Sequence, residues 1–395
     1  MTHESQFFLD HLGQTSPFPF LIEVDRAEGA YIFDKQGKAY LDMIAGVAVN
    51  NIGHRHPKVI AALKTQLDKH LHVMVYGEFI QDAQQQLVRE LLTVLPVNLN
   101  GVYVVNSGTE AIEAALKLAK RVTGRTELVA FKGSYHGSTH GAMSVSANEV
   151  KKIAFRPLLP DVRFLPHNEI AALEQITTRT AGVIIETIQG DAGVRRPSAA
   201  FMHALRARCT AVGALLIFDE IQCGMGRAGT MFAFEQFDVV PDILTLGKAL
   251  GGGMPIGALV AAQQHLKTFT HAPMLGHITT FGGHPMVCAA AAATVQVLHT
   301  EIDWSLLEQR AAAFAAQITA HPAVQNHRRV GAMFAFDLSS AEAVEKVVQY
   351  CLEQGLITFW FLSHPYSFRL SPPLNLAQKD WDLAAKVIIS ALDRL

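Results

Sequence analysis

The sequence contains a lysine whose surroundings suit covalent chemistry. Lys248 follows the apolar run Ile243–Leu246 and precedes Ala-Leu-Gly-Gly-Gly, so a predicted strand delivers its amine to a stretch with few side chains. An amine in such a setting can form an imine with an aldehyde cofactor and can then carry a proton between carbon atoms. The alternative is a solvated surface lysine, which the apolar strand before it disfavours.

A carboxylate ends a second apolar run. Leu215–Phe218 predicts a buried strand, and Asp219 and Glu220 follow it directly. Because ligands of parallel sheets bind beyond the carboxyl ends of the strands, we expect Asp219 to face a ligand. There it can keep the nitrogen of a pyridine-type cofactor protonated. If both acids only cap the next element, neither reaches a ligand.

A third feature suits a phosphate group. The predicted strand Val102–Val105 is followed by Ser107, Gly108 and Thr109 at the start of a helical pattern. Backbone N–H groups and the dipole at a helix N-terminus attract anions, so we expect these three residues to bind a phosphate. Ser107 alone fits a helix cap equally well.

The elements that position these residues indicate an α/β fold. Between about residues 57 and 281, short β-rich runs alternate with helical patterns, which predicts a parallel sheet covered by helices. Residues 21–41 alternate around a turn at Asp34–Gly37 and predict a hairpin.

The C-terminal part predicts an α+β lobe. After an Ala-rich helix from Pro285, it contains a strand near 332–337, a helix near 341–353 and a last helix after Gln378. We expect an N-terminal part of a small domain (1–50), a large cofactor-binding domain (51–284) and a C-terminal part of the small domain (285–395).

Composition narrows the class of ligand and compartment. The 395 residues carry a formal net charge of -2 without charged runs, which argues against nucleic acid or membrane partners and favours a small-molecule substrate. The four cysteines contain no C-x-x-C pair, which argues against a zinc site and fits a reducing cytoplasm. The N-terminus lacks a signal pattern, and the apolar stretch 286–293 is too short for a membrane span, so we expect an unexported, soluble protein.

Together, the segments 215–222 and 246–253 resemble the signature of the class III pyridoxal-phosphate aminotransferases, which include acetylornithine, ornithine and 4-aminobutyrate aminotransferases. The similarity extends from Asn51–Pro57 to Phe368–Leu370. It implies pyridoxal 5′-phosphate (PLP) as cofactor and the PLP-dependent transferase fold of type I. That fold has a large domain with a mainly parallel seven-stranded sheet flanked by helices, and a small α+β domain from both terminal segments.

The resemblance also implies roles in the cofactor site. Lys248 would hold PLP as a Schiff base, Asp219 would pair with the pyridinium, Tyr135 would stack on the ring and Gln222 would lie near the ring hydroxyl. Thr280 would reach the phosphate of the neighbouring subunit, which implies a homodimer with shared active sites. The implied cofactor-binding residues are Ser107, Gly108, Thr109, Tyr135, His136, Glu186 as a structural support, Asp219, Gln222, Lys248 and Thr280.

Other matching residues are implied to bind substrate. Arg369 would bind the α-carboxylate through its planar guanidinium. Asp191 would pair with this arginine when the substrate lacks that carboxylate, and it is one methylene shorter than the usual glutamate. Tyr76 and Glu78 occupy a region that shapes the substrate entrance, and Glu78 would suit a cationic amino group.

One departure affects the choice of substrate. Ser138 stands where acetylornithine and ornithine aminotransferases usually carry an arginine for a second carboxylate. Without that arginine, a bidentate contact to the second carboxylate, of roughly a few kcal/mol, is lost. We expect a ping-pong transfer from an ω-amine or amino acid, with N-acetylornithine or ornithine-like donors first, to 2-oxoglutarate. An aminomutase of the glutamate-1-semialdehyde type and a decarboxylating transaminase use the same machinery and stay open.

Functions from other classes of protein have weaker support in the sequence. Gly224–Gly229 satisfies G-x-G-x-x-G, but it does not directly follow a strand as the site of an NAD-dependent oxidoreductase requires. His136 and His140 have the spacing of metal ligands on a helix, but Gly137 and Ser138 favour a loop, and we expect no metal site. A non-enzymatic binding protein on the same fold is disfavoured because both Lys248 and Asp219 are present.

Overall fold

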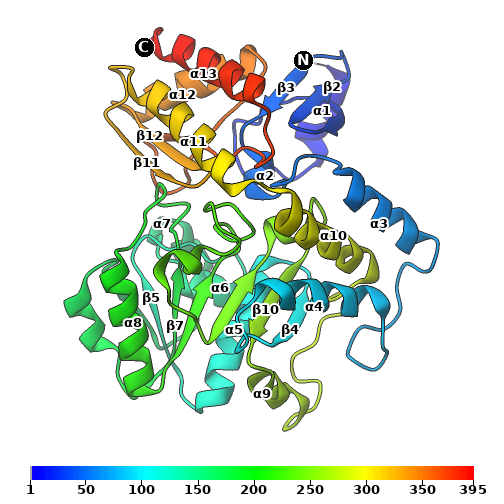
Figure 1. Ribbon diagram of the computed structural model, residues 1–395. Helices are drawn as coiled ribbons and strands as arrows, with labels where there is room; N and C mark the ends of the chain where they lie inside the picture. Colours follow the sequence, from blue (N-terminus) through cyan, green and yellow to red (C-terminus); the bar gives the residue numbers. More distant parts are fainter. Residues whose placement is uncertain (1) are drawn as a thin grey trace.

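The computed structural model describes residues 2–395 and is built around a seven-stranded sheet (Figure 1). The strand order is β4-β10-β9-β8-β7-β5-β6. Strand β10 runs antiparallel to both of its neighbours, and the other pairs are parallel, which confirms the predicted mainly parallel sheet. The strands are β4 (Gly101–Val105), β5 (Glu127–Phe131), β6 (Val162–Leu165), β7 (Thr180–Glu186), β8 (Leu215–Asp219), β9 (Ile243–Leu246) and β10 (Gly257–Ala261).

Helices cover both faces of this sheet, which explains why its central strands are apolar throughout. Ile184 and Ile217 pack in the same cluster as helix α5, whereas Ile185 and Phe218 pack in the cluster that includes α8 and α10. Neighbouring residues of a strand therefore enter different cores. The flanking helices are α5 (Gly108–Thr123), α6 (His140–Val145), α8 (Ala199–Val212) and α10 (Pro285–Glu301), and α10 packs against both α3 (Pro57–Leu67) and α4 (Asp82–Val94).

The two ends of the chain meet in a small lobe above the large sheet (Figure 1). The predicted N-terminal hairpin is confirmed, with Gly37 at a φ of 85° in its turn. A C-terminal strand pairs with this hairpin in parallel, so the small lobe is built from both terminal segments as predicted. The sheet order is β1 (Val24–Glu28), β2 (Tyr31–Asp34), β3 (Ala39–Asp42) and β13 (Leu356–Ile357).

A second small sheet is formed by the C-terminal segment. Its order is β11-β12-β15-β14, and the predicted strand and two last helices are present. The elements are β11 (Asn326–Val330), β12 (Met333–Asp337), β14 (Phe359–Trp360), β15 (Ser367–Leu370), α11 (Trp304–Thr319), α12 (Ala341–Glu353) and α13 (Gln378–Leu392). The boundaries of the domains at residues 51 and 285 stay a prediction.

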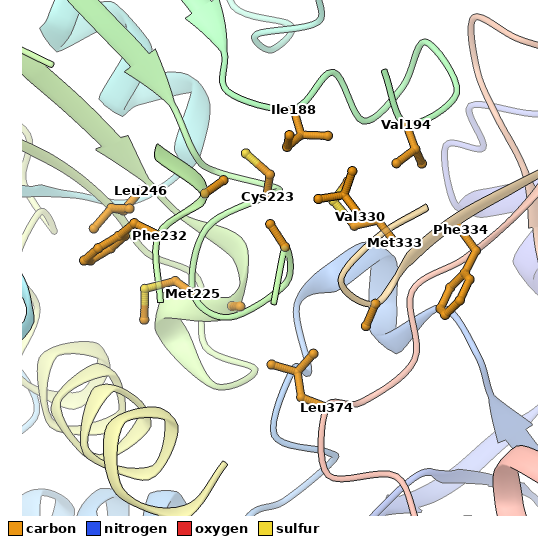
Figure 2. Packing of buried hydrophobic residues seen from close by; sticks show 14 of the residues in the cluster. Ile188, Val194, Cys223, Met225, Phe232, Leu246, Val330, Met333, Phe334 and Leu374 are labelled. Atoms are coloured by element: carbon orange, nitrogen blue, oxygen red, sulfur yellow. The ribbon is translucent and has the colours of Figure 1, made fainter. Parts of the chain in front are cut away.

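One hydrophobic core joins this sheet to the large one (Figure 2). Met333 and Phe334 of β12 pack in the same cluster as Cys223, Met225 and Phe232, which follow β8. The C-terminal sheet is therefore fixed against the end of β8, where Asp219 lies.

The remaining helices are short. They are α1 (His3–His11), α2 (Ala45–Ala48), α7 (Glu149–Lys152), α9 (Gln263–Leu266), and the 3-10 helices η1 (Ile153–Phe155), η2 (Ile170–Gln175), η3 (Ala233–Phe237), η4 (Lys248–Gly251) and η5 (Lys267–Thr270). Within residues 2–395, no helix combines the length and apolar character that a membrane crossing requires. The same residues contain no cluster of side chains suited to holding a metal ion.

Candidate active site

A cavity of about 420 Å³ lies at the carboxyl ends of the central strands. Side chains from the loops after β4, β5, β7, β8 and β9 reach it, and the C-terminal sheet contributes its other wall. The structure thus brings ten of the sequence-predicted site residues together. These are Gly108, Thr109, Tyr135, His136, Glu186, Asp191, Asp219, Gln222, Lys248 and Arg369.

Lys248 enters the cavity directly after β9. Its backbone has a positive φ of 41°, a conformation that a residue with a side chain adopts at a cost and that is common at functional sites. Burial lowers the pKa of the Lys248 amine, although the nearby carboxylate of Asp219 acts in the opposite direction. A lowered pKa increases the fraction of neutral amine, which is the nucleophilic form.

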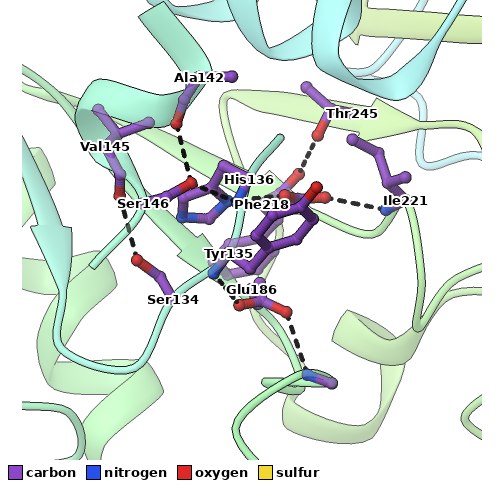
Figure 3. Close-up of polar contacts among 12 residues, drawn as sticks. Ser134, Tyr135, His136, Ala142, Val145, Ser146, Glu186, Phe218, Ile221 and Thr245 are labelled. Atoms are coloured by element: carbon purple, nitrogen blue, oxygen red, sulfur yellow. Dashed lines mark hydrogen bonds and ion pairs between the residues drawn. The ribbon is translucent and has the colours of Figure 1, made fainter. Parts of the chain in front are cut away.

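Asp219, at the end of β8, is buried and held from two sides. Its Oδ2 lies 2.7 Å from Nδ1 of His136, and its Oδ1 accepts a hydrogen bond of 3.0 Å from the Ile221 N–H. His136 is fixed in turn, because its backbone N–H donates to Ser146 Oγ at 2.9 Å (Figure 3). The carboxylate therefore has a defined orientation at the cavity wall.

The neighbouring carboxylate of Glu220 points away from the cavity. Its two oxygens accept hydrogen bonds of 2.7 Å from the N–H groups of Ala233 and Phe234, at the start of η3. Burial raises the pKa of Glu220 to about 8. Of the two acids that end the strand, Glu220 caps the next element and Asp219 lines the cavity.

Glu186 connects two loops beneath the cavity. Its carboxylate accepts hydrogen bonds from the backbone N–H groups of Tyr135, at 2.9 Å, and Gly190, at 3.0 Å (Figure 3). Burial and the nearby charge of Asp219 raise the pKa of Glu186 to about 8, and these two hydrogen bonds only partly offset them. Glu186 therefore holds the backbone that carries Tyr135.

The N-terminus of α5 closes another side of the cavity. Ser107 Oγ accepts a hydrogen bond of 3.3 Å from the Glu110 N–H, so the cap that the sequence allowed is present. Gly108 and Thr109 line the cavity, whereas Ser107 is absent from its lining. This end of a 16-residue helix offers free N–H groups and the positive end of its dipole to an anion.

Sequence reasoning missed a glycine that shapes this helix end. A Cβ atom on Gly257, at the start of β10, would lie 2.1 Å from the carbonyl oxygen of Ser107. Only a glycine there allows the adjacent strand to approach the loop before α5. The glycine at the start of an apolar strand was the available signal, but the partner loop lies 150 residues earlier in the chain.

Arg369, on β15, brings a buried guanidinium to the cavity. Its Cζ lies 5.1 Å from the centre of the Phe361 ring, and burial lowers the pKa of Arg369 against the charges of Asp191 and Glu186. Asp191 forms no ion pair with it in the described part of the chain. Instead, Asp191 accepts hydrogen bonds from Leu362 N, at 3.1 Å, and Ser363 Oγ, at 2.7 Å.

Comparisons with known proteins identify the family of this chain. A sequence model of the family "Aminotransferase class-III" matches residues 13–392. The chain is 35% identical over 373 residues to an acetylornithine aminotransferase from Archaeoglobus fulgidus, covering 93% of this chain and 95% of the relative. A putrescine aminotransferase from Pectobacterium atrosepticum is 37% identical over 383 residues, covering 92% of this chain and 80% of the relative.

The crystal structure of the ornithine aminotransferase from Toxoplasma gondii matches with a TM-score of 0.90 at 27% identity, covering 100% of this chain and 96% of that one. The chain belongs to the class III aminotransferases. It has the fold of the PLP-dependent transaminases, and as a member of this family it is an aminotransferase whose cofactor is PLP.

Besides Ser107, three predicted site residues of the aminotransferase lie outside the cavity. Tyr76, Glu78 and Thr280 are exposed and contribute nothing to its wall. Tyr76 and Thr280 belong to segments that approach each other, because the ring of His72 lies 5.2 Å from the ring of Phe281. Within one subunit, therefore, these segments form outer surface, and the roles of the three residues stay predictions.

The cavity of the aminotransferase also contains Ser138. Ser138 Oγ lies 3.2 Å from the hydroxyl of Tyr135, at the exposed side of the cavity. Among the described residues, Arg369 is the only arginine that lines the cavity.

The alternative of a dinucleotide site is wrong. Gly224–Gly229 lies in a series of turns between β8 and η3 and opens no helix. A phosphate-binding glycine loop of that type requires a helix N-terminus directly after it. The glycines instead let the chain pass close to its neighbours: Gly226 packs against Trp304 and Leu374.

Proposed function

We propose that PLP is held in the described cavity by Asp219, Lys248 and the N-terminus of α5. Three features of the cavity fit the three functional parts of the cofactor. The buried carboxylate of Asp219 suits a cationic ring nitrogen, the free N–H groups at Gly108 and Thr109 suit a phosphate, and the amine of Lys248, whose pKa burial lowers, suits an aldehyde. When bound, PLP supplies an aldehyde that condenses with amines and a ring that accepts an electron pair from the substrate carbon.

In this proposal Lys248 has two tasks. Its Nζ would hold the cofactor through the aldehyde, and once an incoming amine has taken that place, the free amine would accept the proton of the substrate carbon and deliver it to the cofactor carbon. Its lowered pKa supports both tasks, because the free-base form is needed for attack and for proton abstraction.

The other residues of the cavity would orient the cofactor and hold the substrate. Asp219 keeps its partner nitrogen protonated, with its own position fixed by His136. Tyr135 lies where an aromatic ring can stack on the cofactor, on a loop fixed by Glu186, and Gln222 lies at the same wall. Arg369 binds the carboxylate of an amino or 2-oxo acid through two parallel hydrogen bonds.

We further propose the substrates. The enzyme moves an amino group from an ω-amine or amino acid, of the N-acetylornithine or ornithine type, to 2-oxoglutarate in two half-reactions of a ping-pong cycle. The observation that carries this proposal is that Lys248, Asp219 and Arg369 line one cavity. The 35% identity to an acetylornithine aminotransferase over 93% of the chain supports the donor class.

A panel of amines tests the substrate proposal. The purified, PLP-saturated enzyme is incubated with 2-oxoglutarate and each of N-acetylornithine, ornithine, putrescine and 4-aminobutyrate, and glutamate is measured. We expect glutamate only when a donor is added, with N-acetylornithine or ornithine the best. Isomerisation of a single amino compound without any 2-oxo acid would instead identify an aminomutase.

Reduction with borohydride tests the cofactor proposal. Peptide mapping after reduction is expected to place one pyridoxyl group on Lys248. A label on another lysine would reject the assignment of Lys248.

We also propose that the enzyme is a homodimer with shared active sites. The support is the set of exposed apolar side chains on residues 71–81 and 274–281, two segments that approach each other at His72 and Phe281 and are here called the two-segment patch. Thr280 lies in the same patch, where it would approach the phosphate of a partner subunit. The apolar members are Leu71, Val73, Met74, Tyr76, Phe79, Ile80, Met274, Leu275, Ile278 and Phe281.

A further inference from the structure

The loop 361–366 covers one side of the active-site cavity. It connects β14 to β15, so it belongs to the C-terminal sheet, while the opposite wall comes from the large sheet. Leu362 lines the cavity, and Phe361 supports the Arg369 guanidinium. The position of this loop therefore sets both the width of the cavity and the place of its arginine.

Asp191 fastens the loop to the large domain. The carboxylate is buried, and both of its oxygens are used: Oδ1 accepts from Leu362 N at 3.1 Å and Oδ2 accepts from Ser363 Oγ at 2.7 Å. Ser363 Oγ also accepts from Asn148 Nδ2 at 3.2 Å. Hydrogen bonds of this kind to a buried carboxylate are stronger than those between neutral groups.

A second connection ties the same two loops together. Arg328 hydrogen-bonds to the carbonyl oxygen of Gly193, two residues after Asp191, and holds both oxygens of Asp337 at 2.6 Å. Asp337 in turn lies 3.2 Å from Nε2 of His364, next to Ser363. The segment around Asp191 and the cavity loop are thus joined at two points.

This arrangement leaves Arg369 without an internal acid. The two oxygens of Asp191 are directed at Leu362 N and Ser363 Oγ and not at the guanidinium. Among residues 2–395, no carboxylate lies within 4 Å of the Arg369 nitrogens.

We infer that Asp191 is a positioning residue that latches the loop 361–366 over the cavity, and that Arg369 stays open to a substrate carboxylate in both half-reactions. The second part rests on the proposed function, in which Arg369 binds that carboxylate. The latch needs two hydrogen-bond acceptors or an acceptor and a donor at position 191, but it needs no negative charge. An ion pair with Arg369 would need the charge.

This difference makes Asp191→Asn and Asp191→Ala a discriminating pair. The asparagine oxygen can accept from Leu362 N, and its NH₂ group can donate to Ser363 Oγ, so the latch survives. Alanine removes both contacts, and Ser363→Ala removes one while leaving Asp191 charged.

The kinetic test uses the holoenzyme with 2-oxoglutarate and the best donor of the panel. We expect Asp191→Asn to keep KM for 2-oxoglutarate within about twofold of the wild type, because the latch survives. Asp191→Ala loses two hydrogen bonds and is expected to raise this KM about 3- to 10-fold, and Ser363→Ala loses one and is expected to raise it about 2- to 5-fold. The values of kcat change less than those of KM. If asparagine and alanine shift donor and acceptor kinetics alike and Ser363→Ala has no effect, Asp191 acts on Arg369 through its charge and the latch is rejected.

A second readout does not depend on turnover. Limited digestion with chymotrypsin, which cuts after aromatic residues and leucine, reports how often the loop with Phe361, Leu362 and Tyr366 opens. Faster cleavage there in Asp191→Ala and Ser363→Ala, but not in Asp191→Asn, supports the latch, and equal cleavage in all four proteins overturns it. An inactive wild type would instead reject the proposed function, and the digestion result would still decide the latch.

Discussion

The Nδ1 atom of His136 lies 2.7 Å from Oδ2 of Asp219, and both side chains are buried. Burial of a carboxylate is costly unless it is paired, so the contact with the histidine stabilises the carboxylate of Asp219. The other ring nitrogen, Nε2, has no partner among the described residues, so His136 has one fixed role, toward Asp219. The adjacent Glu220 offers an internal comparison, because it is equally buried but faces away.

Asp219→Asn is expected to lower kcat/KM by about 10- to 100-fold or more, because a neutral amide replaces the charge-assisted bond to the ring nitrogen. The measurement is the rate of amino transfer at saturating PLP. Glu220→Gln is the matched control: it disturbs the cap of η3 and so lowers the thermal midpoint, but the folded enzyme should keep a kcat near that of the wild type. Equal losses of kcat in the two variants would contradict the assignment of Asp219.

Gly257→Ala is expected to weaken the binding of PLP. The added Cβ would meet the Ser107 carbonyl oxygen at 2.1 Å and push the N-terminus of α5 away from the phosphate, and overpacking of this kind costs about 1–3 kcal/mol. Titration of the cofactor-free enzyme with PLP measures the effect. Gly13→Ala is the control, because no atom lies within 4 Å of its added Cβ. If both variants bind PLP as the wild type does, the packing at Ser107 does not control the phosphate site.

Much of the fold was predictable because its signals are local. The runs Leu215–Phe218 and Ile243–Leu246 are mostly apolar, which is typical of a parallel sheet, and Asp219 and Lys248 come shortly after them, at the edge of the sheet where ligands bind. The resemblance to class III aminotransferases then gave the sheet and the cofactor. These predictions depend on residues that are close together in the chain.

What could not be predicted depends on distant contacts. The sequence does not show that Gly257 packs on Ser107, because this contact forms only when β10 pairs with the distant strand β4. It also does not show that Asp191 reaches Leu362 and Ser363, because these residues meet only after the C-terminal sheet has packed against the large one. The shorter side chain of Asp191, compared with the usual glutamate, was a visible hint against a pair with Arg369. Its actual partner, Leu362, lies 171 residues away in the chain. Which of two adjacent acids faces the ligand was likewise decided by the turn after β8, where Glu220 meets the start of η3.

The buried carboxyl of Glu186 predicts a dependence of stability on pH. Its pKa rises from an ordinary value of 4.5 to about 8 in the folded protein, so the folded state binds this proton more tightly than the unfolded state. Such a group favours folding most at low pH, and its contribution is lost as the pH rises from 4.5 toward 8. Glu186→Gln cannot ionise. We therefore expect the difference in thermal midpoint, variant minus wild type, to increase between pH 5 and pH 8, measured on cofactor-free protein. A difference that stays constant or decreases would show that Glu186 is ionised throughout.

The two-segment patch predicts the effect of a charge on assembly. Ile80 and Met274 are 86% and 77% exposed in a single subunit, so a dimer that covers them would bury a large apolar area. Ile80→Asp places a charge inside that interface and is expected to shift the enzyme toward monomers in light scattering coupled to size-exclusion chromatography. Val150→Asp is the control, because Val150 is 87% exposed but lies outside the patch.

If Thr280 reaches the phosphate in a partner subunit, the monomeric Ile80→Asp variant also binds PLP more weakly than Val150→Asp does. A variant that stays dimeric, or a wild type that is monomeric, would reject the proposed interface, whereas a monomer with unchanged PLP affinity would reject the shared site alone.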